Sequence, residues 1–563
     1  MDPWRYLVSF YPLLKRHSAF LLATVLLVSS SALAMTWHDL NGRMDGLQNE
    51  FLHVGNSLDF WLAWENRDVY HLKHFLETYP WPPGFYAWPW PFFALFGSSH
   101  KAMVASNIAH LAVLLWATYE LARFLLDRRA GMLAMALVSL YPSVAGNLVR
   151  YEPNLAAVAW VTVSALCLVR SRKFGDRRWS IGLGVALGVG LLMDRLTVGL
   201  FLVLPVLLEW GLGLRSAKWR QRLKNSLIAL SVFLLIAGPW YQGFFVHHLP
   251  ELMEQAALGE VDSTGALTER RAPLALTTLL FYFSTLLDGQ AGLVPGLAGL
   301  LAVGAWLLRR DSASRVPGVL VLSAWLLFTL IQKKQVYYTI PMLGCLAVLT
   351  VSWFRMLHRS GWLVTVFVLG CAMHQVGLRM WGSGLPLPEP VSTMLGGEVI
   401  HEDWVAPRYA QASEPGGHAW PVEELAEVLP PGEVLVFSED GNWYEGYLVL
   451  QVRERLPGRR VRGLLGDPNG TYEWYRTAAS LIYVGADPQQ QWPSEAHIQA
   501  ALAQQHYVLE DLPPVAKVIS SLESDFVGLG AWPLADGKKA RVFTRLTARV
   551  GDPHSGWPPQ EAP

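Results

Sequence analysis

The sequence predicts an α-helical polytopic membrane protein that carries a small soluble α/β domain at its C-terminal end. Of the 563 residues, 52% are hydrophobic and only 16% are charged, whereas soluble domains average about 25% charged residues. The charge is also unevenly distributed, because long apolar stretches fill residues 20–380 and an ordinary soluble composition follows. We therefore expect a membrane domain over residues 1–381, a linker over 382–420 and a soluble domain over 421–563.

Apolar segments long enough to form transmembrane helices recur along the first domain. They lie near residues 18–36, 100–126, 131–147, 154–169, 180–194, 196–213, 225–243, 291–308, 317–331, 336–354 and 361–381. This pattern predicts about eleven transmembrane helices, with a count of twelve or thirteen left open. No small-x-small cleavage site follows the first segment, so we interpret it as a retained span. Residues 273–289 are apolar but short and contain Asp288, so we expect a partly embedded helix there.

The distribution of lysine and arginine predicts how the chain is oriented. Loops on the N-terminal side of the spans carry twenty basic residues, and the longer loops on the opposite side carry eleven before the soluble domain begins. Basic loops stay in the cytoplasm, so we expect a cytoplasmic N-terminus and a C-terminal domain on the outer face.

In the soluble domain, strands are expected at GEVLVFSED (432–440), ASLIYVGAD (479–487) and ARVFTRLTARV (540–550), and helices at 442–456 and 493–506. Alternating strands and helices of this kind indicate a small α/β fold. The domain contains no recognisable catalytic motif, so we expect it to cover the outer opening, to help select an acceptor, or to act only as a structural cap.

Other composition signals exclude several functions. The net charge is zero, so nothing favours nucleic-acid binding. The three cysteines, Cys167, Cys345 and Cys371, all lie in apolar stretches and imply neither a disulfide framework nor a zinc site. The stretch GLGVALG (182–188) lies inside a predicted span, so we expect close helix packing there and not a dinucleotide-binding loop.

The turns predicted to face outward carry charge at the membrane edge, where a charge is costly unless it faces a cavity or a partner. The candidate residues are Asp45 just beyond the first span, Glu152 in RYEPN, Arg195 in MDRLT, and Lys333, Lys334, Tyr337 and Tyr338 in QKKQVYY. Basic groups beside carboxylates suit a substrate whose phosphate lies at headgroup depth, with the cations binding the phosphate and a carboxylate acting as base. A snorkelling membrane anchor is the alternative for Arg195.

Two long outward loops, 37–99 and 244–272, add further candidates. The stretch YPWPPGFYAWPWPFF (79–93) suits the headgroup level of a membrane, and an aromatic belt with no other role would explain it equally well. Candidate ligands for a divalent metal are His53, Glu77, His247 and His248. The alternative is that these are ordinary polar loop residues, and no other cofactor is expected.

Several of these stretches occur in an order that resembles the GT-C glycosyltransferases. The resemblance is to the bacterial family 39 relatives of protein O-mannosyltransferases and of the aminoarabinose transferase that modifies lipid A. It runs through residues 20–355 and begins with Asp45, the acid soon after the first span. It continues through YPWPPGFYAW, LLDRRAGMLAMALVSLYP, RYEPN, GLLMDRLTVGLFLVLPVLL, GPWYQGFFVHH and QKKQVYYTIPMLG.

This resemblance implies a transferase of the bacterial cytoplasmic membrane, with its C-terminal domain in the periplasm. The implied donor is a polyprenyl-phosphate-linked sugar, transferred with inversion to a hydroxyl or phosphate of a lipid, glycan or protein at the outer face. Carried over by position, Asp45 is the general base and Glu152 a second acid. Arg195 holds the lipid phosphate where relatives often have lysine, and Lys334 and Tyr338 complete the phosphate site.

Three other functions remain open from the sequence. A transporter or flippase for a lipid-linked substrate also needs many spans and edge charges, but usually shows internal repeats that are absent here. An oligosaccharide ligase or polymerase of related architecture would use a larger donor. A membrane anchor for a periplasmic binding module would not need the charges at the outward turns.

Overall fold

The computed structural model divides the chain into two compact units, residues 1–261 with 267–412 and residues 262–266 with 413–563. It describes residues 20, 23–33, 48–65, 67–69, 72–73, 76, 81–247, 249, 276–309, 311–331, 337–381, 428–429, 433–438, 461–463, 478–485, 526–533 and 539–545. The predicted linker, 382–420, lies outside the described residues, so the domain boundaries stay predictions.

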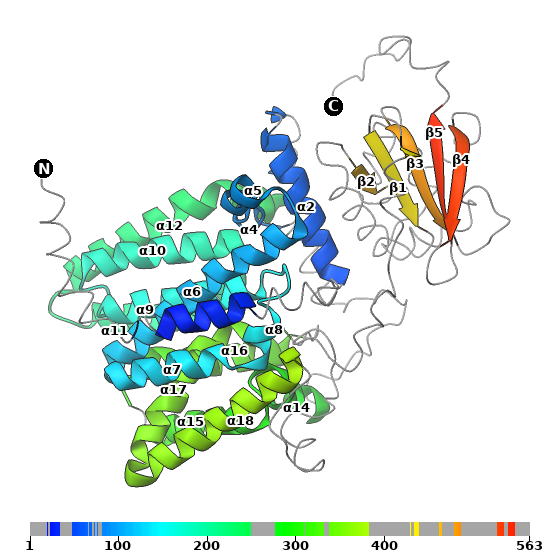
Figure 1. Cartoon of the computed structure of the whole chain (residues 1–563). Helices are drawn as coiled ribbons and strands as arrows, with labels where there is room; N and C mark the ends of the chain where they lie inside the picture. Colours follow the sequence, from blue (N-terminus) through cyan, green and yellow to red (C-terminus); the bar gives the residue numbers. More distant parts are fainter. Residues whose placement is uncertain are drawn as a thin grey trace, which may run out of the picture. The chain divides into compact units, whose positions relative to one another are not determined.

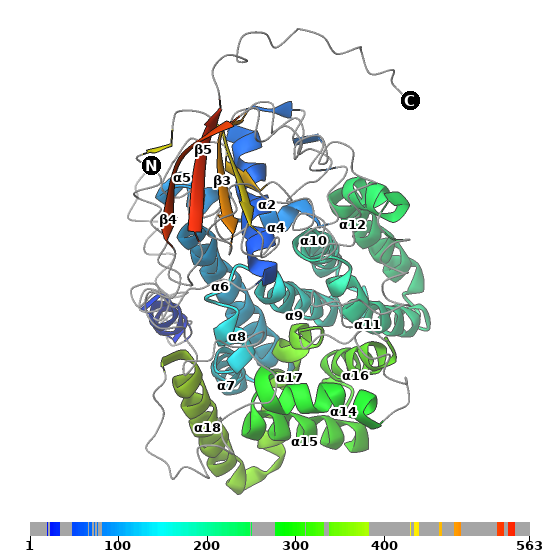
Figure 2. The same ribbon diagram turned by 90° about the vertical axis from the view of Figure 1, so that its right-hand side faces the viewer.

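The first unit is built from helices (Figures 1 and 2). A helix at Ala23–Leu33 precedes α2 (Gln48–Glu65), α4 (Pro83–Ala87), α5 (Trp90–Phe96), α6 (His100–Leu125), α7 (Arg128–Ser139), α8 (Pro142–Gly146), α9 (Asn154–Arg170), α10 (Arg177–Met193), α11 (Thr197–Leu214), α12 (Trp219–His247), α14 (Leu276–Thr285), α15 (Leu293–Arg309), α16 (Arg315–Leu330), α17 (Leu343–Met356) and α18 (Gly361–Trp381). A π-helical turn, η1 (Leu286–Gln290), and the 3₁₀ turns η2 (Ile340–Met342) and η3 (His358–Ser360) complete it.

The helices confirm the predicted helical class. Most of the predicted spans coincide with one helix within a few residues, and 131–147 is divided between α7 and α8. Among the described residues, α6, α11 and Trp219–Val246 of α12 are long and apolar enough to cross a membrane, and six shorter helices are also apolar. The number of crossings therefore stays a prediction. The short apolar segment expected at 273–289 forms α14 and the π-helical turn.

The outer surface of this unit is apolar. Large hydrophobic side chains on α11, α12 and α18 are exposed, among them Leu207, Leu235 and Phe367. Many exposed large hydrophobic side chains are unfavourable in water, and a lipid bilayer would cover them. The surface therefore fits a multi-pass membrane protein.

The centre of the unit is α9, which packs against α6 and α10 and is buried over most of its length. The close pairing of α10 with α12 depends on the glycines of GLGVALGVG. A Cβ atom at Gly188 would lie 2.8 Å from Cβ of Ile236 on α12, and one at Gly184 would overlap the backbone of Ala229. Only glycine fits at this separation, so the small-residue interpretation of the stretch is confirmed. The three cysteines are buried and free, as expected.

The second unit contains a five-stranded mixed sheet in the order β2-β1-β3-β5-β4. The strands are β1 (Glu433–Ser438), β2 (Val461–Gly463), β3 (Ala478–Gly485), β4 (Phe526–Pro533) and β5 (Lys539–Arg545). β1 pairs in parallel with β2 and β3, whereas β5 is antiparallel to β3 and β4. The three predicted strands are present, β2 and β4 were not predicted, and the two predicted helices lie outside the described residues.

Candidate active site

The candidate site lies at the end of the helical unit where α9 and α11 begin and α10 and α16 end. These termini share one end because consecutive helices joined by short turns run antiparallel. Glu152 precedes α9, Arg195 lies between α10 and α11, and Tyr337 and Tyr338 follow α16. Of the other sequence-predicted residues, Asp45, Glu77, Lys333, Lys334 and His248 lie outside the described part of the chain, and His247 is described only in its backbone.

Arg195 is a half-buried cation at this end. Its guanidinium carbon lies 3.8 Å from the centroid of the Trp81 ring, close enough for a cation–π interaction. Within the described residues, no carboxylate forms an ion pair with it. Burial lowers the pKa of Arg195, and the neighbouring Tyr86, Asp194, Tyr337 and Tyr338 act in the opposite direction. Arg195 is therefore a partly desolvated cation whose described neighbours are aromatic rings, hydroxyls and one buried acid.

His53 of α2 lies beside this cation. Its Nδ1 atom is 3.0 Å from the Tyr86 hydroxyl, and its ring meets the Trp81 ring edge-on with a centroid distance of 4.8 Å. Burial and the charge of Arg195 lower the pKa of His53 to about 3, so the imidazole is neutral at physiological pH. Asn56 donates to the same tyrosine hydroxyl from the next turn of α2.

A metal site at His53 does not fit what is described. No three His, Cys, Asp or Glu side chains of the described residues are grouped to hold an ion. His53 itself faces a tyrosine hydroxyl and a guanidinium, and a nearby positive charge opposes the binding of a cation. Glu77, His248 and the His247 side chain lie outside the described residues, so the predicted metal site stays a prediction.

Glu152 is held in a buried polar turn. Only 4% of the residue is exposed, and its Oε2 atom accepts a hydrogen bond of 2.7 Å from Nδ2 of Asn154, the first residue of α9. A carboxylate at a helix N-terminus is also favoured by the helix dipole. Asn107 of α6 fixes the turn from the other side, because its amide donates to the carbonyl oxygens of Asn147, Leu148 and Arg150.

Tyr151 connects the Glu152 turn to the aromatic cluster around Arg195. Its hydroxyl lies 2.6 Å from the Ser57 hydroxyl on α2 and donates to the carbonyl oxygen of Phe85 on α4. Its ring stacks on that of Phe85 with a centroid distance of 4.6 Å, and Phe85 in turn contacts His53. The structure thus joins Glu152, His53 and Arg195 through one continuous set of contacts.

The two tyrosines after α16 complete the described part of the site. The rings of Tyr337 and Tyr338 are perpendicular, with centroids 5.3 Å apart, and Tyr338 packs on Phe328 of α16. Thr339, the next residue, exchanges hydrogen bonds with the Gln290 side chain of the π-helical turn. Both tyrosine hydroxyls are coupled electrostatically to Arg195.

Trp81 and Tyr86 were not predicted as site residues, because both lie in a stretch that an aromatic belt explains equally well. The available signal was the order of the residues. Pro82 and Pro83 follow Trp81 directly, and Pro83 opens α4, whose residues Phe85 and Tyr86 are both buried. Proline is favoured at the first position of a helix, so PPGFYA could have been predicted as a short helix beginning after Trp81.

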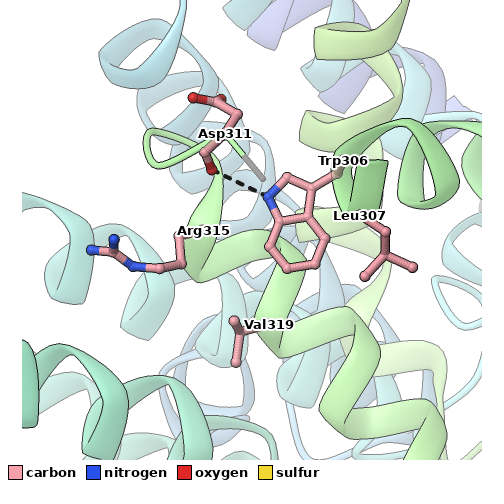
Figure 3. Close-up of a pocket in the computed structure, with 5 residues that line it drawn as sticks. All are labelled: Trp306, Leu307, Asp311, Arg315 and Val319. Atoms are coloured by element: carbon pink, nitrogen blue, oxygen red, sulfur yellow. Dashed lines mark hydrogen bonds between the residues drawn. The ribbon is translucent and has the colours of Figure 1, made fainter. Parts of the chain in front are cut away.

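A separate surface hollow lies where α15 meets α16 (Figure 3). It is lined by Trp306, Leu307, Asp311, Arg315 and Val319. Its polar groups are already bound within the protein. The Trp306 indole donates to the Asp311 carbonyl oxygen, and Arg315 pairs with Glu209. The Asp311 carboxylate accepts hydrogen bonds from the Ala313 and Ser314 amides just before α16. The hollow lies at the start of α16, about 24 Å of helix away from the Tyr337 end.

Comparisons with known proteins agree with the resemblance seen in the sequence. Residues 81–241 match the family model described as dolichyl-phosphate-mannose-protein mannosyltransferase. No curated protein matches the chain. Among solved structures, ArnT from Cupriavidus metallidurans in the apo state is 13% identical, with a TM-score of 0.54 over 92% of this chain and 97% of that chain. The same protein bound to undecaprenyl phosphate is 14% identical, with a TM-score of 0.54 over 94% of this chain and 99% of that chain.

At such low identity the likeness to ArnT shows the fold, which covers nearly the whole chain. The family match adds a sequence relationship over the segment that contains Trp81, Glu152 and Arg195. Both findings agree with the resemblance to the GT-C glycosyltransferases that the ordered motifs predicted: the family match over residues 81–241, and the fold over nearly the whole chain.

Proposed function

We propose that this protein transfers a sugar from a polyprenyl-phosphate-linked donor to an acceptor at the outer face of the cytoplasmic membrane. The observation that carries the proposal is Arg195, a partly desolvated guanidinium that stacks on Trp81 and pairs with no described carboxylate. Such a group suits a phosphate, because guanidinium binds phosphate oxygens bidentately. The ArnT structure with undecaprenyl phosphate supports a lipid phosphate as the ligand.

In the proposed reaction, an acceptor oxygen forms a bond to C1 of the sugar while the bond between C1 and the phosphate oxygen breaks. The electron pair of the broken bond leaves on the phosphate, so polyprenyl phosphate departs with one additional negative charge. Arg195, Tyr337 and Tyr338, together with Lys333 and Lys334, stabilise that charge. Attack opposite to the departing phosphate inverts the configuration at C1.

The acceptor proton is assigned to Asp45 as general base. Glu152 is assigned to orienting the acceptor. The support for its role is that Asn154 fixes one carboxylate oxygen in a buried turn joined by contacts to the Arg195 cluster. Acceptors of three classes fit this chemistry: a lipid, a glycan or a protein that offers a hydroxyl or a phosphate.

The test uses purified protein in lipid nanodiscs, a panel of radiolabelled polyprenyl-phosphate sugars, and membrane extract as the source of acceptor. Wild type should transfer label from one donor, and Asp45→Asn should lose roughly 10²–10⁴-fold in rate. Glu65→Gln, an exposed acid at the end of α2, is the matched control and should retain activity.

Two results would count against this proposal. Equal rates for Asp45→Asn and wild type would remove Asp45 as the base. No turnover with any donor, combined with movement of labelled lipid across proteoliposomes, would favour a flippase.

A further inference from the structure

We infer that Tyr241 is a positioning residue for Arg195, acting through the backbone of the turn between α10 and α11. The inference rests on the proposed function, because it assigns to Arg195 the binding of a phosphate. Tyr241 lies on α12, in the GPWYQGFFVHH stretch, and its side chain is buried. Neither the charge pattern nor the proposed reaction gives it a role.

The turn that carries Arg195 has an unfavourable backbone conformation. Leu196 has a φ of 44° and lies in the left-handed region, which is sterically unfavourable for every residue except glycine. The Thr197 hydroxyl donates to the Arg195 carbonyl oxygen over 2.9 Å, and the Thr197 amide donates to the same oxygen. A leucine stays in this conformation only where its surroundings hold it there.

Tyr241 supplies the contact that holds it. The Leu196 amide donates to the Tyr241 hydroxyl over 3.1 Å, and that hydroxyl donates to the Leu191 carbonyl oxygen over 3.2 Å. One oxygen thus connects the last turn of α10 to the strained residue and satisfies two backbone groups that a helix end leaves without partners. Arg195 lies between Leu191 and Leu196 in the sequence, so this pair of hydrogen bonds fixes the backbone from which the Arg195 side chain extends.

The packing of α12 makes this pair of hydrogen bonds possible. Because glycines on α10 let α12 approach closely, the Tyr241 hydroxyl reaches the end of α10. The Tyr241 ring is fixed edge-on against Trp240, with a centroid distance of 4.8 Å, and edge-on against Phe244 at 5.4 Å. The hydroxyl is therefore held by rigid neighbours, as a positioning group requires.

Removing the hydroxyl should release the turn. In Tyr241→Phe, Leu196 loses its hydrogen-bond acceptor and relaxes out of the left-handed region, and the Arg195 guanidinium moves from its place on Trp81. We expect the affinity for undecaprenyl phosphate in nanodiscs to fall roughly tenfold, the size of one net hydrogen bond. Hydrogen exchange at the Leu196 amide should become faster in the same variant.

Glycine at position 196 provides the decisive rescue, because glycine adopts a positive φ without strain. The double variant Tyr241→Phe with Leu196→Gly should bind undecaprenyl phosphate within about threefold of Leu196→Gly alone. Leu196→Val should weaken binding with Tyr241 intact, because a β-branched residue disfavours this conformation further. Tyr119→Phe is the control, since it removes a buried hydroxyl that has no hydrogen-bond partner among the described residues, at the other end of the unit.

The outcomes separate the inference from the proposed function. If wild type binds undecaprenyl phosphate and Tyr241→Phe binds it equally well, the inference is wrong. It is also wrong if the double variant stays as weak as Tyr241→Phe, because the hydroxyl then acts through packing and not through the turn. If wild type binds no polyprenyl phosphate, the proposed function fails, and exchange at the Leu196 amide alone decides whether Tyr241 fixes the turn.

Discussion

Arg195 differs from the arginines at the other end of the helical unit in how its charge is balanced. At the end where α6, α9, α11 and α17 terminate and α16 begins, several described arginines are paired with carboxylates: Arg123 with Glu120 within α6, and, between different elements, Arg170 with Glu120, Arg355 with Asp127 and Arg315 with Glu209. At the opposite end, Arg195 stacks on an indole and has no described carboxylate partner. A cation whose charge is already neutralised by an ion pair stabilises a fold, whereas one that forms no ion pair is available to bind an anionic ligand.

The largest effect on stability is expected at the paired end. Glu120 is 8% exposed and accepts hydrogen bonds from Arg123 over 2.7 and 2.8 Å, in addition to binding Arg170. Glu120→Ala leaves two guanidinium groups without this acceptor and should cost about 3–5 kcal/mol in the free energy of unfolding. Thermal unfolding in detergent should show a clear fall in Tm, while the affinity for undecaprenyl phosphate of the folded fraction should not change.

Arg355→Ala is the matched control for that prediction. Both members of its pair with Asp127 are about half exposed, and an exposed pair contributes about 0–1 kcal/mol. An equal fall in Tm for Glu120→Ala and Arg355→Ala would contradict the prediction, because the stabilisation by an ion pair would then not depend on its burial.

At the Arg195 end we expect a change in affinity with little change in stability. Arg195→Ala should lower the affinity for undecaprenyl phosphate about 10–100-fold, the value of a charge-assisted hydrogen bond. Its Tm should not fall much, because removing the side chain also removes the cost of burying a cation. Arg195→Lys should be intermediate, since lysine keeps the charge and loses the planar fork. Unchanged affinity in Arg195→Ala would favour the snorkelling anchor.

The sequence was sufficient to predict the helices but not the contacts around Arg195. Hydropathy and length determine where a chain leaves the bilayer, so the predicted spans 154–169 and 196–213 match α9 and α11 closely. A charge at a turn is visible in the same pattern, and Arg195 was therefore predicted. Its partner Trp81 was not, because 114 positions separate the two residues and only the three-dimensional fold brings them together.

The sequence also could not predict places where a residue adopts a backbone conformation that its type disfavours. Nothing about a leucine predicts a positive φ at position 196, because the preference of the residue is the opposite. Strand β4 was missed for a similar reason. Its sequence, FVGLGAWP, contains two glycines and ends in proline, all of which are depleted in strands. Pairing with β5 overrides that weak preference.

Stability and phosphate affinity should depend on pH through Asp194, the residue next to Arg195. Asp194 is buried beside Arg195, and burial raises its pKa to about 7, although the Thr197 hydroxyl and Arg195 oppose the shift. The folded protein therefore holds a proton that the unfolded chain releases above about pH 4. The stability that this proton contributes is complete below about pH 4 and is lost as the pH rises through 7.

Asp194→Asn should remove that dependence. Between pH 6 and 8 the wild type should lose Tm and phosphate affinity more steeply than the variant, because ionised Asp194 repels an anion near Arg195. The phosphate also titrates near pH 6, so the measured quantity is the difference between the two proteins at each pH. Parallel curves would mean that Asp194 does not ionise in this range.

The smallest expected effect tests the indole itself. Trp81→Leu removes the cation–π contact, which contributes roughly 0.5–2 kcal/mol, and should weaken undecaprenyl phosphate binding about two- to thirtyfold while Arg195 remains. The other end offers a control, because Arg220 lies 5.5 Å from the centroid of the Trp219 ring. Trp219→Leu should leave the affinity unchanged. If both variants bind undecaprenyl phosphate as wild type does, the contact between Trp81 and Arg195 contributes nothing to binding. The difference between Arg195 and the paired arginines then depends only on the ion pairs that those arginines form.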